Sequence, residues 1–389
     1  MIRLAFFIHF NRTWLGGINV ILNLINTIYQ NRKNKTLSKI QIIIITNSRH
    51  KLKKYSINKK IEVIEDNNFF NKNIFLRIID KISLVFFNKT IFFEKLLLKY
   101  RIDFTSHSNL VSGNNSRSKS IVWIPDFQYL HFPELFTFKN RLLKSLNLKI
   151  YAKHAYKILL SSFDAKKDLK KVCNIPDNKI VVNRFSFEVP SKKKLRGFLY
   201  LKKKYKLPKK FFYLPNQYWV HKNHKIVIET LKKIKDRNKN IFICSTGSKY
   251  DHRNPYLFEN LMKTIRENKL VNNYKYFGVV PYLDVMSLMY HSLAVINPSY
   301  FEGWSSTVEQ ANSYGKIIIL SNIKVHLEQN PSKGFFFNPN DSNSLAKIFL
   351  NVYRGKKIKK NKMILGRSQK KLKEKIKEYS DNYCNILNL

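Results

Sequence analysis

Short apolar runs alternate with longer amphipathic stretches along the first half of the chain. An apolar run at residues 4–10 precedes Gly16-Gly17, and the apolar positions of residues 20–29 then recur with helical spacing. The predicted order is therefore strand, glycine turn, helix. Residues 41–46 (QIIIIT) form a continuous β-branched run, which is typical of a strand covered on both faces in a parallel sheet. Further strands are predicted at residues 61–64, 104–105, 121–124 and 158–161.

The second half of the chain repeats this alternation. Strands separated by helices indicate βαβ units, in which the strands are parallel. We therefore predict an α/β protein with a doubly wound parallel sheet in each half. The strands of the second half are predicted at residues 211–214, 241–244, 274–277, 294–297 and 317–320, and its helices at residues 225–235, 257–268, 283–291 and 306–314.

A basic stretch at residues 191–210 separates the two halves. Because 389 residues exceed what a single hydrophobic core normally serves, two Rossmann-like domains are expected. We place the N-terminal domain at residues 1–195 and the C-terminal domain at residues 196–365. Residues 366–389 are lysine-rich with helical apolar spacing, which indicates either an amphipathic crossover helix or a solvated terminal helix.

The chain carries a formal net charge of +47, which nucleic acid, an anionic membrane surface or anionic small substrates would each explain. A composition bias toward Lys, Asn and Ile, as an AT-rich genome imposes, explains it equally well. A nucleic-acid-binding protein should interleave basic and aromatic residues on one face. The lysines instead spread through nearly every predicted helix, and no nucleic-acid-binding motif is present, so we expect no nucleic-acid partner.

Cysteine usage and hydropathy indicate a cytoplasmic protein. Cys173, Cys244 and Cys384 lie far apart with no C-x-x-C pair, which fits a reducing compartment and neither zinc nor redox chemistry. The first apolar run lacks a signal-peptide cleavage site, and no stretch approaches the ~20 apolar residues of a membrane-spanning helix. A membrane contact would be peripheral, on the inner face, through the basic stretch at 191–210 and the basic carboxyl terminus.

Residues 297–311 (NPSYFEGWSSTVEQA) carry the clearest candidate chemistry. They follow a predicted strand and lead into a helix that Ser305, Ser306 or Thr307 would cap. The start of such a helix presents backbone N–H groups and a positive dipole end, which suit a diphosphate. Glu302 lies on the loop and Gln310 lies about two turns into the helix, so one can reach a transferred sugar while the other reaches ribose hydroxyls.

This segment, followed by GKIIILSNIKVHLEQNP, resembles the signature of family 4 of the glycosyltransferases, the group 1 enzymes of GT-B fold. That family typically has two glutamates with seven residues between them. Glu302 matches the first, whereas Gln310 stands at the second, directly after Glu309. The resemblance implies that Glu302, with Gly303 and Trp304 beside it, contacts the donor. Gln310 would hold the ribose through its amide, more weakly than a carboxylate does.

A second match is YLPNQYWVHKNH at residues 213–224. In the family, this loop carries an arginine and, five residues later, a lysine, which together neutralise the donor diphosphate. Lys222 matches the lysine, and Gln217 stands at the arginine position. Negative charge develops on the departing diphosphate, so preorganised cations and amides must face it. No D-x-D pair lies near either segment, and we therefore expect no metal and no cofactor besides the nucleotide-sugar substrate.

Three glycine loops resemble other parts of the family's donor site. Gly16 and Gly17 would let the backbone approach the donor phosphates or the acceptor. Gly247 resembles the glycine of the third-strand loop. The backbone after Gly278, at Val279 or Val280, resembles the edge that borders the nucleotide base.

The segment WIPDFQYLHFPE at residues 123–134 resembles the cleft loop of the family, which is often written around a His-Asp pair. Asp126 matches the aspartate, but Pro125 stands in place of the histidine. Asp126 and Gln128 are therefore candidates for contacts to the acceptor or the transferred sugar. His131 is interpreted as a packing histidine in preference to a base. Further on, Ser162 or Asp164 is expected to cap a helix over residues 165–171, a structural or cleft-lining element.

The resemblance implies a retaining glycosyltransferase that uses a UDP- or GDP-sugar, and the lack of a D-x-D pair indicates that it is metal-independent. The acceptor would be a glycan or lipid-linked molecule, as in bacterial surface polysaccharide (O-antigen or lipopolysaccharide) biosynthesis. Transfer would pass through an oxocarbenium-like state, with no protein nucleophile. A catalytically inactive GT-B scaffold is the alternative, because Gln217, Gln310 and Pro125 each depart from the family pattern.

Overall fold

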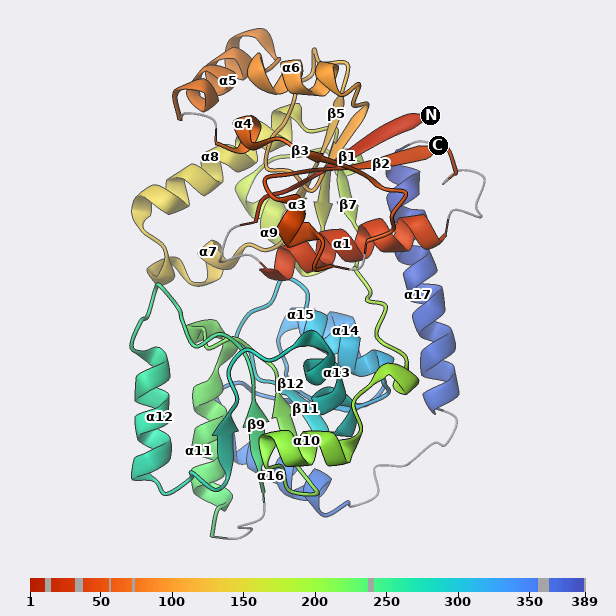
Figure 1. Ribbon diagram of the computed structural model, residues 1–389. Helices are drawn as coiled ribbons and strands as arrows, with labels where there is room; N and C mark the ends of the chain where they lie inside the picture. Colours follow the sequence, from red (N-terminus) through yellow and green to blue (C-terminus); the bar gives the residue numbers. More distant parts are fainter. Residues whose placement is uncertain are drawn as a thin grey trace. The chain divides into compact units, whose positions relative to one another are not determined.

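The computed structural model describes residues 1–10, 15–31, 38–55, 57–71, 74–236, 241–355 and 364–387, without the side chains of Leu15, Ile74 and residues 364–371. The chain divides into two units (Figure 1). Unit 1 comprises Met1–Phe185 together with Ile376–Leu389, and unit 2 comprises Ser186–Lys375. Each unit is an α/β domain built on its own parallel sheet, as the sequence predicts.

The sheet of unit 1 has seven strands in the order β3-β2-β1-β4-β5-β6-β7. All neighbouring strands are parallel, and the order reverses between β1 and β4, which is the doubly wound arrangement. The strands are β1 (Ile2–Ile8), β2 (Ile40–Thr46), β3 (Glu62–Glu65), β4 (Phe104–Ser106), β5 (Lys119–Ile124), β6 (Lys157–Leu160) and β7 (Ile180–Val182).

Helices of unit 1 pack on the apolar faces of this sheet. Ala5 and Phe7 of β1 share one buried cluster with Ile43 of β2 and Phe93 of α6, whereas Phe6 between them is buried on the other face of the sheet. On the other side of the switch point, residues of β5 and β6 share a second cluster with α8 and α9. The helices are α1 (Leu15–Gln30), α3 (Arg49–Leu52), α4 (Asn67–Phe70), α5 (Ile74–Phe87), α6 (Phe92–Lys99), α7 (Gln128–His131), α8 (Phe138–His154) and α9 (Phe163–Val172).

The sheet of unit 2 has six strands in the order β10-β9-β8-β11-β12-β13, again with all neighbours parallel. Counted from β8, this is the order 3-2-1-4-5-6 of dinucleotide-binding domains, with the switch point between β8 and β11. The strands are β8 (Phe212–Leu214), β9 (Ile243–Ser245), β10 (Tyr274–Tyr276), β11 (Ala294–Asn297), β12 (Ile317–Ser321) and β13 (Gly334–Phe337).

Both faces of this second sheet are buried, which explains the continuous apolar runs of its strands. Phe212 and Leu214 contact a cluster that includes α11, α12 and α16, whereas Tyr213 between them contacts a cluster that includes α10, α13 and α14. The helices are α10 (Phe198–Tyr205), α11 (His224–Ile234), α12 (Leu257–Glu267), α13 (Tyr282–His291), α14 (Ser306–Ser313), α15 (Lys324–Gln329), α16 (Ser342–Tyr353) and α17 (Ile364–Ile386).

The boundary between the units falls before the predicted junction at residue 195, because the intervening segment packs on unit 2. The carbonyl of Pro190 accepts a hydrogen bond from the Tyr314 hydroxyl at 2.8 Å. The backbone N–H of Arg196 donates to Ser287 Oγ at 2.9 Å, and Leu195 packs against the apolar cluster of α10 and α13. The basic stretch is therefore part of unit 2 and does not separate two folded units.

The carboxyl-terminal helix α17 passes from unit 2 into unit 1. Its last turns are buried in unit 1 and are not those of a solvated terminal helix. Ser380 Oγ accepts from Asn31 Nδ2 at 2.7 Å, and the ring of Tyr383 lies 6.4 Å from the ring of Phe6. No helix among the described residues is long and apolar enough to cross a bilayer.

Candidate active site

The loops that follow β8 and β11 meet at the carboxyl edge of the second sheet. These strands are adjacent, with Tyr213 paired to Val295, and the strand order reverses between them. Ligands of doubly wound sheets bind outside the carboxyl ends of the strands at such a switch point. The two segments singled out in the sequence, residues 213–224 and 297–311, supply these two loops.

Lys222 and Glu302 form a buried ion pair at this edge. Lys222 Nζ lies 2.7 Å from Glu302 Oε1 and 2.8 Å from Oε2, and the two side chains are 15% and 9% exposed. Lys222 ends a 3₁₀ turn, Val220–Lys222, and Asn223 follows in the left-handed region with φ 52°. The Asn223 side-chain amide donates to Pro298 O at 3.2 Å, which ties the two loops together.

The charge state of this pair is fixed by its surroundings. Burial acts to raise the pKa of Glu302, but the facing Lys222 ammonium, with a smaller contribution from His326, outweighs it and lowers that pKa to about 2. Burial lowers the pKa of His221 to about 3 and that of His326 to about 4. At neutral pH the edge therefore holds an anionic Glu302, a cationic Lys222 and two uncharged imidazoles.

Three polar residues that the sequence analysis did not single out form a hydrogen-bonded chain that reaches Glu302 through Ser299. Ser299 Oγ donates to Glu302 Oε1 at 2.7 Å. Asn216 Nδ2 donates to Asn297 Oδ1 at 3.1 Å across β8 and β11, and Asn297 Nδ2 donates to Ser305 Oγ at 2.7 Å. Asn216 and Asn297 each stand at the carboxyl end of an apolar run, which is the local signal that could have identified them.

Helix α14 begins beside Glu302 and is capped by Ser305, one of the three predicted candidates. Ser305 Oγ accepts from Val308 N at 3.4 Å. Ser306 and Thr307 form the first turn, whose N–H groups have no partner within a helix and suit an anion. Gly303 and the buried Trp304 join Glu302 to this cap.

Gln310, at the position of the family's second glutamate, and Glu309 before it have different surroundings. Glu309 is buried, and its Oε1 accepts from Gln329 Nε2 at 3.0 Å while Lys375 Nζ lies 3.8 Å from its Oε2. Gln310 is partly exposed. Glu309 therefore holds α14 and α15 together, whereas the ribose contact of Gln310 stays a prediction.

Three further predicted residues lie on loops at the same edge of the sheet. Gly247, after β9, has φ 142°, and its N–H donates to Gly278 O at 3.0 Å, next to Val279, whose side chain is largely exposed. Gln217, after β8, is partly exposed, and its carbonyl lies 3.1 Å from His224 Nε2. The loops after β9 and β10 thus lie beside the loop after β8, which carries Lys222.

Replacing Gly247 with Ala should destabilise unit 2 by about 2–4 kcal/mol, because its φ is strained for other residues and an added Cβ would lie 2.6 Å from Asn216 O. Chemical denaturation measures the change. Gly197→Ala is the matched control, because Gly197 has φ −64° and an added Cβ meets nothing within 4 Å. Equal stability of both variants would contradict the close approach of these two loops.

The remaining predicted residues belong to unit 1. Gly16 and Gly17 lie in the first turn of α1 and not in a turn before it, because the helix begins at Leu15. Trp14, beside them in sequence, lies outside the described residues. Asp126 is exposed, and its Oδ1 accepts from Gln128 N at 3.0 Å, which stabilises the turn before α7.

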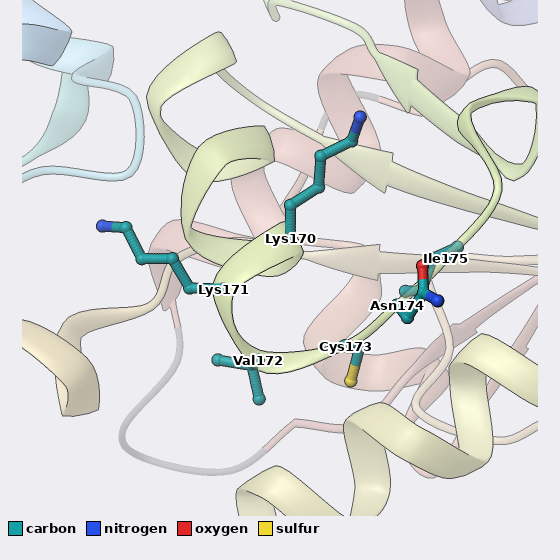
Figure 2. A pocket seen from close by; sticks show the side chains of 6 residues that line it. All are labelled: Lys170, Lys171, Val172, Cys173, Asn174 and Ile175. Atoms are coloured by element: carbon teal, nitrogen blue, oxygen red, sulfur yellow. The ribbon is translucent and has the colours of Figure 1, made fainter.

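His131 is hydrogen-bonded to a carboxylate, which differs from the predicted packing role. Its Nε2 lies 2.6 Å from Oδ2 of the buried Asp168, which Lys171 also contacts at 2.8 Å. Ser162 caps the neighbouring α9, as one of the two predicted alternatives. Figure 2 shows a hollow beyond the end of this helix, and none of its lining residues is a predicted site residue. They are Lys170, Lys171, Val172, Cys173, Asn174 and Ile175.

Within the described part of the chain, no three His, Cys, Asp or Glu side chains gather where they could hold a metal ion. The three cysteines are buried and unpaired with one another. Metal independence itself remains a prediction.

Comparison with known proteins identifies the second unit. The family model described as "Glycosyl transferases group 1" matches residues 201–379. No curated protein matches the chain.

Solved glycosyltransferase structures match the whole fold. A glycosyltransferase from Rickettsia africae ESF-5 has a TM-score of 0.65 and 17% identity, over 100% of this chain and 96% of that one. Anabaena Alr3699/HepE, in complex with UDP and glucose, has a TM-score of 0.72 and 13% identity over 100% of both chains. WaaG, a glycosyltransferase involved in lipopolysaccharide biosynthesis, has a TM-score of 0.63 and 13% identity, over 97% of this chain and 95% of that one. Residues 201–379 thus match a group 1 glycosyltransferase domain, and the chain has the GT-B fold.

Proposed function

We propose that this chain is a family 4 enzyme that transfers a sugar from a nucleotide-sugar donor with retention of configuration and without a metal ion. The observation that carries the proposal is the Lys222–Glu302 pair, which lies at the switch point of the second sheet beside the start of α14. A cation, a helix start and a buried carboxylate at one sheet edge are what a sugar diphosphate requires.

Each residue of the pair has a distinct role in this proposal. An ammonium has three N–H donors, and the two contacts of Lys222 to Glu302 leave one for a phosphate oxygen. Lys222 and the first-turn amides of α14 then stabilise the negative charge on the departing diphosphate. Glu302, ionised at neutral pH, hydrogen-bonds the transferred sugar and stabilises positive charge at its anomeric carbon. The departing diphosphate itself helps to deprotonate the acceptor hydroxyl.

The donor and acceptor classes are proposed from the residues and from the solved relatives. HepE is described in complex with UDP-glucose, TarM from S. aureus with UDP, and WaaG as acting in lipopolysaccharide biosynthesis. We infer a UDP- or GDP-sugar donor, with Gln310 at the ribose and Gln217 at the diphosphate. We further infer a glycan or lipid-linked acceptor of bacterial surface polysaccharide synthesis, at the inner face of the cytoplasmic membrane.

A donor panel tests the reaction. Nucleotide release should occur with one UDP- or GDP-sugar, should be stimulated by a bacterial glycolipid extract, and should be unchanged by EDTA. NMR of the product should show the donor's anomeric configuration. Release that EDTA abolishes would refute metal independence, and an inverted product would refute retention, each without affecting the assignment as a glycosyltransferase.

A catalytically inactive scaffold is the second candidate, because Gln217 and Gln310 both replace charged residues of the family pattern. It predicts that calorimetry detects weak or no binding of any donor in the panel, and that bound donor is recovered intact. Turnover of any one donor excludes it.

A further inference from the structure

Helix α5 presents a stripe of large apolar side chains to solvent. Phe75, Ile78, Ile82, Val85 and Phe86 are 47–75% exposed, and their spacing places them along one side of the helix. The opposite side is buried and includes Ser83 and Leu84. A folded protein rarely leaves a continuous apolar stripe in water unless a partner or a membrane covers it.

Helix α8 adds a second apolar patch surrounded by positive charge. Its exposed apolar residues are Phe138, Leu142, Leu143 and Leu146. Its 17 residues contain no Asp or Glu. They contain five basic residues, Lys139, Arg141, Lys144, Lys149 and Lys153.

Both helices belong to unit 1. Leu84 of α5 and Leu148 of α8 belong to the same buried cluster. The acidic residue of α5, Asp80, is engaged by the backbone N–H of Phe92 at 2.7 Å, so its charge is satisfied at the start of α6. We call these exposed apolar and basic residues of α5 and α8 the α5–α8 surface.

We propose that the α5–α8 surface docks on an anionic lipid bilayer. The apolar side chains would enter the boundary between headgroups and acyl chains, while the lysines would pair with lipid phosphates, as in amphipathic helices that lie on membranes. The proposal goes beyond the transfer reaction and holds whichever donor is used. It also assigns the membrane contact to unit 1 and not to the basic stretch at 191–210, which belongs to unit 2.

Other occupants of this surface fit less well. A second copy of the chain would bring the same five basic residues of α8 and no acidic ones, so two α8 helices would repel each other. A nucleic acid would satisfy the lysines but would leave the apolar stripe of α5 in water. The stretch at 191–210 exposes Leu199, but Lys204 within it is already paired with Asp284 at 2.6 Å.

Vesicle co-sedimentation of the full chain tests the proposal at physiological salt. The vesicles are phosphatidylcholine alone or an equal mixture with phosphatidylglycerol. One variant carries Lys139→Gln, Lys149→Gln and Lys153→Gln. Its matched control carries Lys192→Gln, Lys193→Gln and Lys194→Gln, which removes the same charge from exposed lysines of the basic stretch.

The chain should bind the mixed vesicles and not the neutral ones. The α8 variant should bind roughly a hundredfold more weakly, since each basic residue near the leaflet contributes about fivefold (about 1 kcal/mol). The control should bind like the unmodified chain. A double variant, Val85→Asn with Phe86→Asn, should also lose binding, whereas Leu199→Asn should not; circular dichroism checks that each is folded.

Three outcomes would overturn the proposal. The chain could fail to bind the mixed vesicles. Both lysine variants could weaken binding equally, which would indicate a diffuse effect of net charge. Sedimentation without vesicles could show self-association that the Val85/Phe86 variant abolishes, which would assign the surface to a second copy.

Discussion

Lys222→Met should lower kcat by roughly 10²- to 10³-fold in the donor-turnover assay, because the negative charge that develops on the diphosphate loses its preorganised cation. The donor KM should rise less, since the first-turn amides of α14 still bind the phosphates. Steady-state kinetics with the donor that the panel identifies measures both constants.

Lys225→Met is the matched control for this experiment. Lys225 lies on the first turn of α11, three residues further along the chain, and its side chain is 77% exposed. It should leave kcat unchanged. Lys222→Arg, which keeps the charge, should recover part of the loss. Unchanged turnover of Lys222→Met would show that the ion pair is structural and that other groups face the diphosphate.

The strands were predictable wherever a buried parallel strand leaves a continuous apolar run. Residues 41–46 and 294–297 were located from such runs, and β2 and β11 confirm them within a residue. Two strands were missed, β7 (Ile180–Val182) and β13 (Gly334–Phe337). Both are edge strands of three or four residues, and so short a run does not differ from an apolar loop.

Helices were predictable where their apolar spacing was regular. Helix α12, with a buried Leu261 and Ile265 four residues apart, matches the predicted residues 257–268 within one residue. Helix α8 was missed, because its leucines face several directions and only Leu148 and His154 are buried. A helix that spreads apolar residues around its circumference gives no periodic signal.

For the candidate site, the sequence located the loops but not the contact between them. Glu302 and Lys222 were identified separately from two motifs that lie 80 residues apart, and their pairing depends on the adjacency of β8 and β11. The domain boundary was misplaced for the same kind of reason. Pro190 and Arg196 are held by residues more than 90 positions away, and no local pattern encodes such contacts.

Lys222→Met should also destabilise the protein by about 3–5 kcal/mol at neutral pH, because it leaves a buried carboxylate without its counter-charge. Adding Glu302→Gln to this variant should restore most of the lost stability, since the double variant contains no buried charge at the pair. It should not restore turnover. Urea denaturation followed by circular dichroism measures the free energies of unfolding.

The pH dependence separates this electrostatic loss from a packing defect. The pKa of Glu302 is about 2 in the folded protein and near the ordinary 4.5 when unfolded, so its stabilising contribution of about 3 kcal/mol is complete above pH 4.5 and is lost as the pH falls toward 2. Without Lys222, burial alone should raise the pKa of Glu302, and acid then relieves the penalty by protonating it. Both effects shrink the gap between the unmodified chain and Lys222→Met as the pH falls from 7 to 4 and below. A gap of constant size over that range would mean that lost packing of the lysine side chain, and not an unpaired carboxylate, destabilises the variant.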